Sequence, residues 1–239
     1  MFARTPSHRN LSIALLAMHA VACAESAPQP TSATPPMASV SAPASTAVAA
    51  EPTFEARAVG PLTNAVPLQI VSVFSYEPGE TLISPAIEIA SFVADAREKK
   101  GFGKDALKSM LVTPTPATIK ANQLLVIAWG PRSEFSIARA KEMGHTAMRA
   151  TIESGVSDMA YAPIARDQGV TTIAADEVAA AFVEGALTEF STEQNAGATK
   201  PMKLQHVTYE AGAAFVDAVT KAVSRGVAAS HASIAPHAN

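Results

Sequence analysis

The sequence predicts an α/β domain in which a mainly parallel or mixed sheet is flanked by helices. Apolar strand-like runs alternate with helix-like runs along residues 53–230, a pattern typical of sheets with helices packed on their faces. The run from Leu124 to Trp129 is apolar throughout, as expected of a strand covered on both faces. Residues 215–226 repeat apolar side chains at i, i+3, i+4 and i+7, which predicts an amphipathic helix.

Four runs of apolar or alternating residues are predicted to be strands. The run 123–129 is the strongest and suits the centre of the sheet. Residues 111–120 contain Pro114 and Pro116, so any strand there must lie at an edge or be broken, because proline cannot donate to a sheet ladder. The predicted strands are 68–74, 123–129, 158–164 and 204–209.

The helices are predicted from apolar spacing and from residues that favour a helix start. Ser133 follows a turn at Gly130-Pro131 and is predicted to be an N-cap, because a serine side chain accepts a hydrogen bond from the first helical turn. Residues 104–110 are expected to form a helical turn. The predicted helices are 88–98, 133–153, 174–189 and 215–226.

The N-terminus is predicted to be a secretory signal peptide over residues 1–22. A basic segment precedes an apolar run at 11–22, and Ala20 and Ala22 supply the small residues that signal peptidases require. The apolar run is shorter than the roughly 20 residues of a membrane-spanning helix. The alternative, a buried N-terminal helix, is disfavoured by the polar, proline-rich segment that follows. Cleavage is therefore expected directly before Cys23.

Cys23 is the only cysteine, so no disulfide can form within the chain. The stretch Ala20-Val-Ala-Cys23 resembles a bacterial lipobox, in which the cysteine is lipidated and anchors the protein to a membrane. Alanine replaces the usual leucine at position 20, which leaves ordinary cleavage and a free thiol as the alternative. Ala24 is not an acidic retention residue, so the expected location is the periplasmic face of the bacterial outer membrane; otherwise the protein is soluble in the periplasm or secreted.

The chain divides by composition into four segments. Residues 24–52 are mostly Ala, Pro, Ser and Thr, which bury too little apolar surface to offset the entropy of ordering. We therefore expect a linker with extended stretches. The four segments are the signal peptide 1–22, the linker 23–52, the folded domain 53–230 and a disordered tail 231–239.

Composition and motifs argue against several kinds of function. The net charge is −3 and the lysines and arginines are scattered, whereas nucleic-acid binding requires a clustered basic face. The six histidines show no metal-ligand spacing, and His145 and His206 are expected to be structural. Asp176 and Glu177 are expected to stabilise a helix N-terminus. The sequence contains neither a Gly-x-Ser-x-Gly elbow nor a Walker motif, and we expect no metal and no cofactor.

The segment Trp129-Gly130-Pro131-Arg132-Ser133 most resembles a ligand site. It joins the end of a predicted strand to the start of a predicted helix. Open α/β sheets commonly bind ligands there, and a helix N-terminus holds anions through its free N–H groups. Trp129, Gly130, Arg132 and Ser133 are therefore candidate binding residues. The alternative is a tight turn with Trp129 packed in the core.

Several motifs, taken in order, resemble the N-terminal domain of the leucine (cytosol) aminopeptidase family. They follow one another from Leu68 to Phe190, within a resemblance that extends to Ala229. The motifs are Leu68-Gln-Ile-Val-Ser-Val-Phe74, Gly101-Phe-Gly-Lys104, Gln123-Leu-Leu-Val-Ile-Ala-Trp-Gly130, Ser136-Ile-Ala-Arg139, Ala147-Met-Arg149 and Glu177-Val-Ala-Ala-Ala-Phe-Val-Glu-Gly185, with Phe190 near the family's aromatic position.

The resemblance implies a macro-domain-like sandwich and a function without catalysis. In that family the metals and catalytic residues belong to a second domain, and no stretch here resembles its Asn-Thr-Asp-Ala-Glu-Gly-Arg motif. We therefore expect an exported binding or scaffold domain that associates with a protein partner or with itself through apolar helix faces. The alternatives are an accessory or regulatory subunit of a separate metallo-aminopeptidase chain, and a domain that binds a nucleotide-like small molecule.

Overall fold

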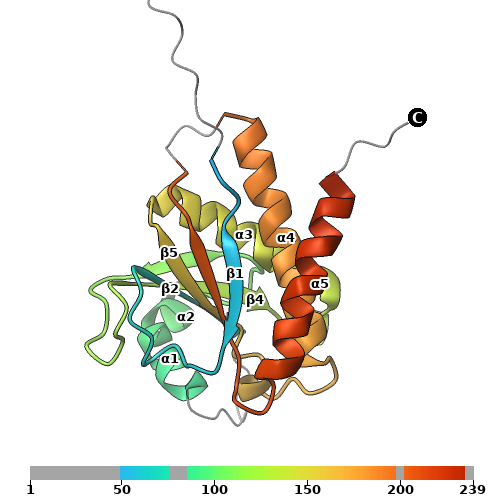
Figure 1. Cartoon of the computed structure of the whole chain (residues 1–239). Coiled ribbons are helices and arrows are strands. Elements are labelled where there is room, and N and C mark those ends of the chain that lie inside the picture. The colour runs from blue at the N-terminus through green and yellow to red at the C-terminus, as the bar shows by residue number, and fades with distance from the viewer. Residues whose placement is uncertain (1–48, 76–84, 198–201, 235–239) are drawn as a thin grey trace, which may run out of the picture. The chain divides into compact units, whose positions relative to one another are not determined.

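A six-stranded sheet forms the centre of the computed structural model, with the order β1-β6-β5-β2-β4-β3 (Figure 1). All neighbouring strands are parallel except β3, which runs antiparallel to β4. The predicted class, an α/β fold with a mainly parallel sheet, is therefore confirmed. The strands are β1 Thr53–Arg57, β2 Leu68–Phe74, β3 Ser109–Val112, β4 Gln123–Gly130, β5 Asp158–Ala162 and β6 His206–Glu210.

The structure describes residues 49–75, 85–197 and 202–234. The predicted signal peptide, Cys23 and most of the predicted linker lie outside the described residues. No helix within the described ranges is both long and apolar enough to cross a membrane.

Helices cover both faces of the sheet (Figure 1). One face carries α3, α4 and α5, and the other carries α1 and α2. Two short 3₁₀ turns, η1 and η2, follow β4 and β5. The bounds are α1 Ala86–Phe92, α2 Ala94–Lys100, η1 Arg132–Glu134, α3 Ile137–Ser154, η2 Arg166–Gln168, α4 Ala175–Asn195 and α5 Val216–Ile234.

The apolar runs of β2 and β4 are buried because both of their faces are covered. In β2, Ile70 and Phe74 belong to the core under α3, α4 and α5, whereas Val71 and Val73 belong to the core under α1. Successive side chains of a strand point to opposite faces, so a strand between two helical layers needs apolar residues at nearly every position. β4 meets this requirement, but it lies second from the edge of the sheet rather than at its centre.

Three glycines allow the helices of the larger layer to approach closely. A Cβ atom added at Gly144 of α3 would lie 2.1 Å from a carbonyl oxygen of α4, and one added at Gly185 of α4 would lie 2.0 Å from a carbonyl oxygen of α3. At Gly226 of α5 the corresponding distance to a carbonyl oxygen of α4 is 2.5 Å. Backbone atoms therefore occupy the space that a side chain would need, and α4 is held between its two neighbours.

The structure contains an edge strand that the sequence analysis did not predict. β1 pairs in parallel with β6, and its residues alternate between exposed and half-buried. This alternation is the pattern of a strand covered on one face only. It was missed because the strand is short and directly follows the proline-rich segment.

The predicted start of the third helix was wrong. Ser133 is not an N-cap, because it lies within the 3₁₀ turn η1. The N-cap is Ser136, whose hydroxyl oxygen accepts a hydrogen bond from the backbone N–H of Arg139 at 3.2 Å. A serine three residues further along the chain thus satisfies the capping preference.

Other predicted boundaries also require correction. The helix predicted at 88–98 is two helices, broken at Val93. In place of the helical turn expected at 104–110, residues 104–107 form turns and Ser109 and Met110 belong to β3. The tail predicted to begin at residue 231 starts inside α5, which continues to Ile234. There His231 contacts Glu51 through its Nε2 atom at 3.0 Å. Any strand at 111–120 was expected to lie at an edge or be broken; β3 lies at the edge of the sheet and includes only Leu111 and Val112 of that range.

Gly185→Ala is expected to destabilise the fold, although alanine is the better helix former. The added methyl group would meet the backbone of α3, and overpacking of this kind costs about 1–3 kcal/mol. The control is Gly60→Ala, where an added Cβ meets nothing within 4 Å and a change within about 0.5 kcal/mol is expected. Urea unfolding followed by circular dichroism measures both, and a Gly185→Ala variant as stable as the unaltered protein would contradict the packing argument.

Candidate functional site

A cavity of about 290 Å³ lies at the carboxyl ends of β5 and β6. Because the strands around it are parallel, their carboxyl ends meet at one edge of the sheet, at the bottom of the sheet in Figure 1. The start of α4 and the start of α5 also line it. Ligands of open α/β sheets bind at this edge, and we refer to this space as the carboxyl-edge cavity.

Apolar side chains form most of the wall of the carboxyl-edge cavity. They come from the loops after β1, β4, β5 and β6, from the start of α1 and from α4 and α5, so the cavity is built from segments far apart in the sequence. The apolar lining residues are Val59, Pro61, Pro85, Phe135, Ala162, Pro163, Ile164, Ala165, Val170, Ile173, Ala175, Val178, Ala211, Phe215 and Val219.

The turn η2 contributes two charged side chains to the same wall. The guanidinium carbon of Arg166 lies 4.8 Å from the centre of the Phe215 ring, a geometry in which the cation is attracted to the aromatic face. Burial raises the pKa of Asp167 above its ordinary value, and the nearby charge of Arg166 opposes part of that rise. Arg166, Asp167 and Phe215 therefore form one interacting group on the wall of the cavity.

Glu210, the last residue of β6, is the most buried charged residue of the lining, with 4% of its surface exposed. Its carboxylate oxygens accept hydrogen bonds from the Nδ2 atom of Asn64 at 2.8 Å and the Nε2 atom of Gln69 at 3.4 Å. These bonds favour the ionised form, but burial has the larger effect and raises the pKa of Glu210 to about 7. Near neutral pH this carboxyl group therefore exists in both protonation states.

Tyr209 lines the cavity from the neighbouring position and is almost completely buried. Its ring packs edge-on against Tyr161 and Phe182. Burial raises the pKa of Tyr209 well above its ordinary value, so the hydroxyl stays neutral. Within the described part of the chain this hydroxyl has no hydrogen-bond partner.

The structure places the four candidate binding residues apart from this cavity. Trp129 is 1% exposed and stacks on Phe74, with ring centres 5.9 Å apart, and its indole N–H donates to the carbonyl oxygen of Pro163 at 3.3 Å. Gly130, Arg132 and Ser133 follow it in the turn and in η1, and none of the four lines the carboxyl-edge cavity. The indole packs in the core, as the alternative interpretation of this segment described.

Sequence reasoning missed Arg166, Asp167 and Glu210. The rule that ligands bind at the carboxyl ends of strands was applied to one strand only, although the same edge contains the ends of five. The strand predicted at 158–164 also extended too far, since β5 ends at Ala162, and this concealed the loop that carries Arg166 and Asp167. The order of the strands in the sheet was the missing information.

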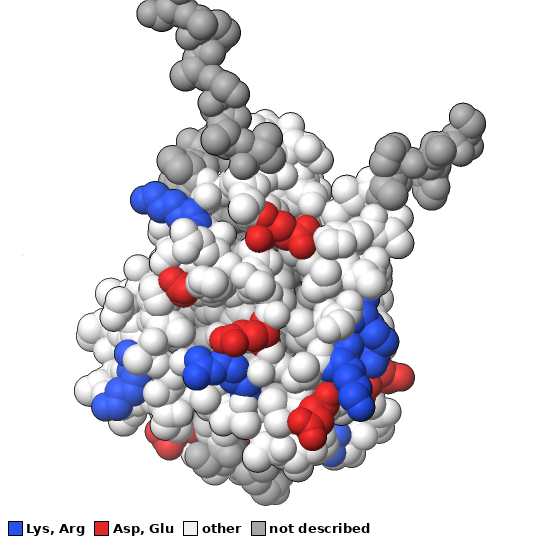
Figure 2. Space-filling view, in the orientation of Figure 1, with Lys and Arg blue, Asp and Glu red and all other residues white. Residues whose placement is uncertain are grey.

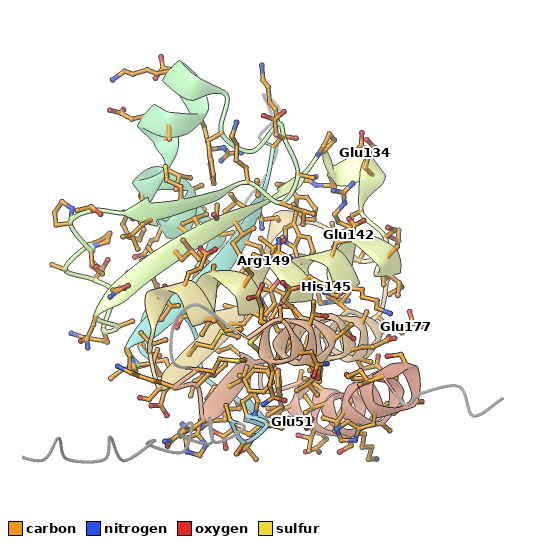
Figure 3. The ribbon with its side chains drawn as sticks, turned by 90° about the horizontal axis from the view of Figure 1, so that it is seen from above. Glu51, Glu134, Glu142, His145, Arg149 and Glu177 are labelled. Atoms are coloured by element: carbon orange, nitrogen blue, oxygen red, sulfur yellow. The ribbon has the colours of Figure 1, made fainter. Side chains whose placement is uncertain are left out.

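A second polar cluster joins α3 to α4, and its α3 members His145 and Arg149 are labelled in Figure 3. The buried carboxylate of Glu189 accepts a hydrogen bond from the Nε atom of Arg149 at 2.8 Å and contacts Nδ1 of His145 at 3.1 Å. Lys141 and Glu184 form a further pair at 2.7 Å. These contacts give His145 a structural partner across the helix pair. Within residues 49–75, 85–197 and 202–234, no group of three or more His, Cys, Asp or Glu residues is arranged to hold a metal ion.

Charged side chains are interspersed on the face shown in Figure 2, where basic and acidic groups alternate without a large area of one sign. The ion pairs agree with this view: Arg57 lies 3.8 Å from Glu55, and Arg225 lies 2.9 Å from Asp176. This face provides no basic surface of the kind that binds a phosphate backbone.

The raised pKa of Glu210 predicts a pH dependence of stability. A carboxyl group whose pKa rises from 4.5 to about 7 on folding stabilises the fold fully below pH 4.5, and this stabilisation is lost as the pH rises toward 7. Over that window the loss amounts to about 3 kcal/mol at most. Urea unfolding from pH 4.5 to 7.5 is expected to give a flatter profile for Glu210→Gln than for the unaltered protein.

The matched control for this measurement is Glu98→Gln, because Glu98 is exposed on α2. This variant is expected to keep the pH profile of the unaltered protein. Profiles of equal slope for Glu210→Gln and the unaltered protein would show that Glu210 titrates in the native state as it does in the unfolded chain.

No protein-family model matches the sequence, and neither does any curated protein. Solved structures do match it: a mutant of tomato leucine aminopeptidase, at 14% identity and a TM-score of 0.54 over 74% of this chain, and a mutant macrodomain of Oceanobacillus iheyensis, at 12% identity and a TM-score of 0.51 over 77% of this chain. The match covers 36% of the aminopeptidase chain and 95% of the macrodomain chain. The chain therefore has a macrodomain-like fold that is similar to the N-terminal region of leucine aminopeptidase.

Proposed function

We propose that this chain is a binding domain whose ligand is a small, largely apolar molecule held in the carboxyl-edge cavity. The observation that carries the proposal is the cavity itself, which is lined by apolar side chains from α4, α5 and the loops around them and contains a few polar groups. Binding sites for small molecules have this composition. With a volume of about 290 Å³, the cavity is at the small end of the usual range.

The lining is mainly apolar, which supports the binding of a hydrocarbon. The described lining residues include no Ser, Thr, Cys, Lys or His. Its polar side chains are those of Arg166, Asp167, Tyr209 and Glu210. Burial of about 100 Å² of apolar ligand surface would contribute roughly 2.5 kcal/mol, so we expect the hydrocarbon part of the ligand to supply much of the affinity.

The similarity to a macrodomain is a similarity of fold, and it does not indicate which ligand binds. A nucleotide carries several negative charges, whereas the described lining contains one cation, Arg166, and two carboxyl groups, Asp167 and Glu210. This balance favours an apolar ligand over the nucleotide-like ligand considered as an alternative above. The same balance argues against a binding mode based mainly on phosphate contacts.

A panel of ring compounds tests the proposed site. Cyclohexylmethanol, cyclohexylmethylamine and cyclohexanecarboxylate share a hydrocarbon body and differ in charge. We expect at least one of them to produce saturable NMR shifts at the amides of Ala165, Ala211 and Gly212. Ala175→Phe and Ala211→Leu enlarge side chains of the lining, and each is expected to weaken this binding at least fivefold.

The matched control is Ala228→Phe, because Ala228 is exposed on α5 and does not line the cavity. This variant is expected to bind as the unaltered protein does. The proposal is wrong if no member of the panel binds, or if Ala175→Phe and Ala211→Leu bind with unchanged affinity.

We also propose that the protein is exported and anchored by a lipid on Cys23. The basic segment, the apolar run and the small residues before Cys23 support this proposal. Intact-mass analysis is expected to find a mature chain that begins at Cys23 and carries added acyl mass, and Cys23→Ser is expected to block processing or release the protein from membranes. A product that begins at Cys23 without acyl mass would contradict the anchor, and one that retains Met1 would contradict export.

A further inference from the structure

The charges that line the carboxyl-edge cavity are not balanced. Arg166, Asp167 and Glu210 are the charged residues among its described lining. Arg166 lies over the ring of Phe215 and near Asp167, so the charge of Asp167 offsets its charge within η2. Glu210, at the end of β6, contributes the remaining charge.

The groups around Glu210 provide hydrogen bonds but no cation. The loop after β1 and strand β2 provide the neutral amides of Asn64 and Gln69. Arg57 lies directly opposite Glu210 in the β1–β6 register, but its guanidinium contacts Glu55 at 3.8 Å. Across the described residues, no ion pair joins Glu210 to a basic side chain.

A buried carboxylate without a cation is costly, because the protein interior solvates charge poorly. A ligand lowers that cost most by bringing a positive charge into the cavity. A carboxylate or phosphate on the ligand would instead face both Glu210 and Asp167. The apolar wall around the carboxylate suits a hydrocarbon body attached to a single charged group.

We infer that the ligand of the carboxyl-edge cavity is a small hydrophobic amine whose ammonium group pairs with the carboxylate of Glu210. This inference rests on the function proposed above and adds the chemical class of the ligand. Charge-assisted hydrogen bonds between an ammonium group and a carboxylate are among the stronger polar contacts in proteins. Tyr209, with its buried hydroxyl, contributes an additional polar group to the lining.

The pairing predicts that amine binding becomes tighter as the pH rises. An alkylammonium group remains protonated up to about pH 10. A change in affinity near neutral pH therefore reports the ionisation of the Glu210 carboxyl group. Because the pKa of Glu210 is about 7, its ionised fraction rises roughly tenfold between pH 6 and pH 8. The affinity for cyclohexylmethylamine is expected to rise by a similar factor, while the affinity for cyclohexylmethanol stays constant.

The experiment measures the dissociation constants of the three ring compounds by NMR titration of the folded chain at pH 6 and pH 8. At pH 8 we expect cyclohexylmethylamine to bind at least tenfold more tightly than cyclohexylmethanol, and cyclohexanecarboxylate to bind most weakly. Glu210→Gln keeps the size of the side chain and is expected to bind the amine and the alcohol equally at both pH values. Asp167→Asn is the matched carboxylate variant and is expected to keep the preference for the amine.

The outcomes separate the inference from the proposed function. If the alcohol or the carboxylate binds in the cavity more tightly than the amine at pH 8, the cavity remains a binding site and the amine inference is wrong. The inference also fails if Asp167→Asn, instead of Glu210→Gln, removes the preference for the amine. If Glu210→Gln does not fold, the inference is tested by the pH dependence of amine binding to the unaltered protein. An affinity for the amine that does not change between pH 6 and pH 8 overturns the inference.

Discussion

The parallel pairing of β1, β6, β5, β2 and β4 is the constraint from which the rest of the structure follows. Because these five strands are parallel, their carboxyl ends lie at the same edge of the sheet. Loops from β1, β4, β5 and β6 meet there and enclose the carboxyl-edge cavity. It also requires crossovers, and two of them lie on one face of the sheet: α3 between β4 and β5, and α4 between β5 and β6. The cavity is therefore a product of topology, and no single loop builds it.

Close helix packing keeps two walls of that cavity in place. Gly144, Gly185 and Gly226 let α3, α4 and α5 approach until backbone atoms lie where a side chain would otherwise fit. Both α4 and α5 begin at the cavity, so their packing fixes the positions of Val178, Phe215 and Val219. Interiors packed at this density transmit small displacements, and substitutions at the glycines are therefore expected to act at the cavity as well as on stability.

Elements with strong local patterns were predicted from the sequence. Elements and site residues whose role depends on their neighbours in space were not. The buried run 123–129 and the apolar spacing of α5 are local patterns. β4 and the start of α5 were placed correctly, but α5 continues to Ile234, beyond its predicted end. β1 was missed because a short alternating segment is recognised as a strand only when its pairing with β6 is known. Ser133 was taken as the N-cap because it follows the turn at Gly130-Pro131, whereas the cap is Ser136. Glu210 became a site residue only when β1 and β2 placed Asn64 and Gln69 around it. These residues could be grouped only with the order of the strands in the sheet, which no local sequence pattern contains.

The most direct measurement of the central claim is a crystal structure of the chain grown with cyclohexylmethylamine at pH 8. We expect the ring among the apolar residues that line the carboxyl-edge cavity, with the nitrogen atom within hydrogen-bond distance of the carboxylate of Glu210. A ligand bound elsewhere, or a cavity filled by its own side chains in that crystal, would contradict the account.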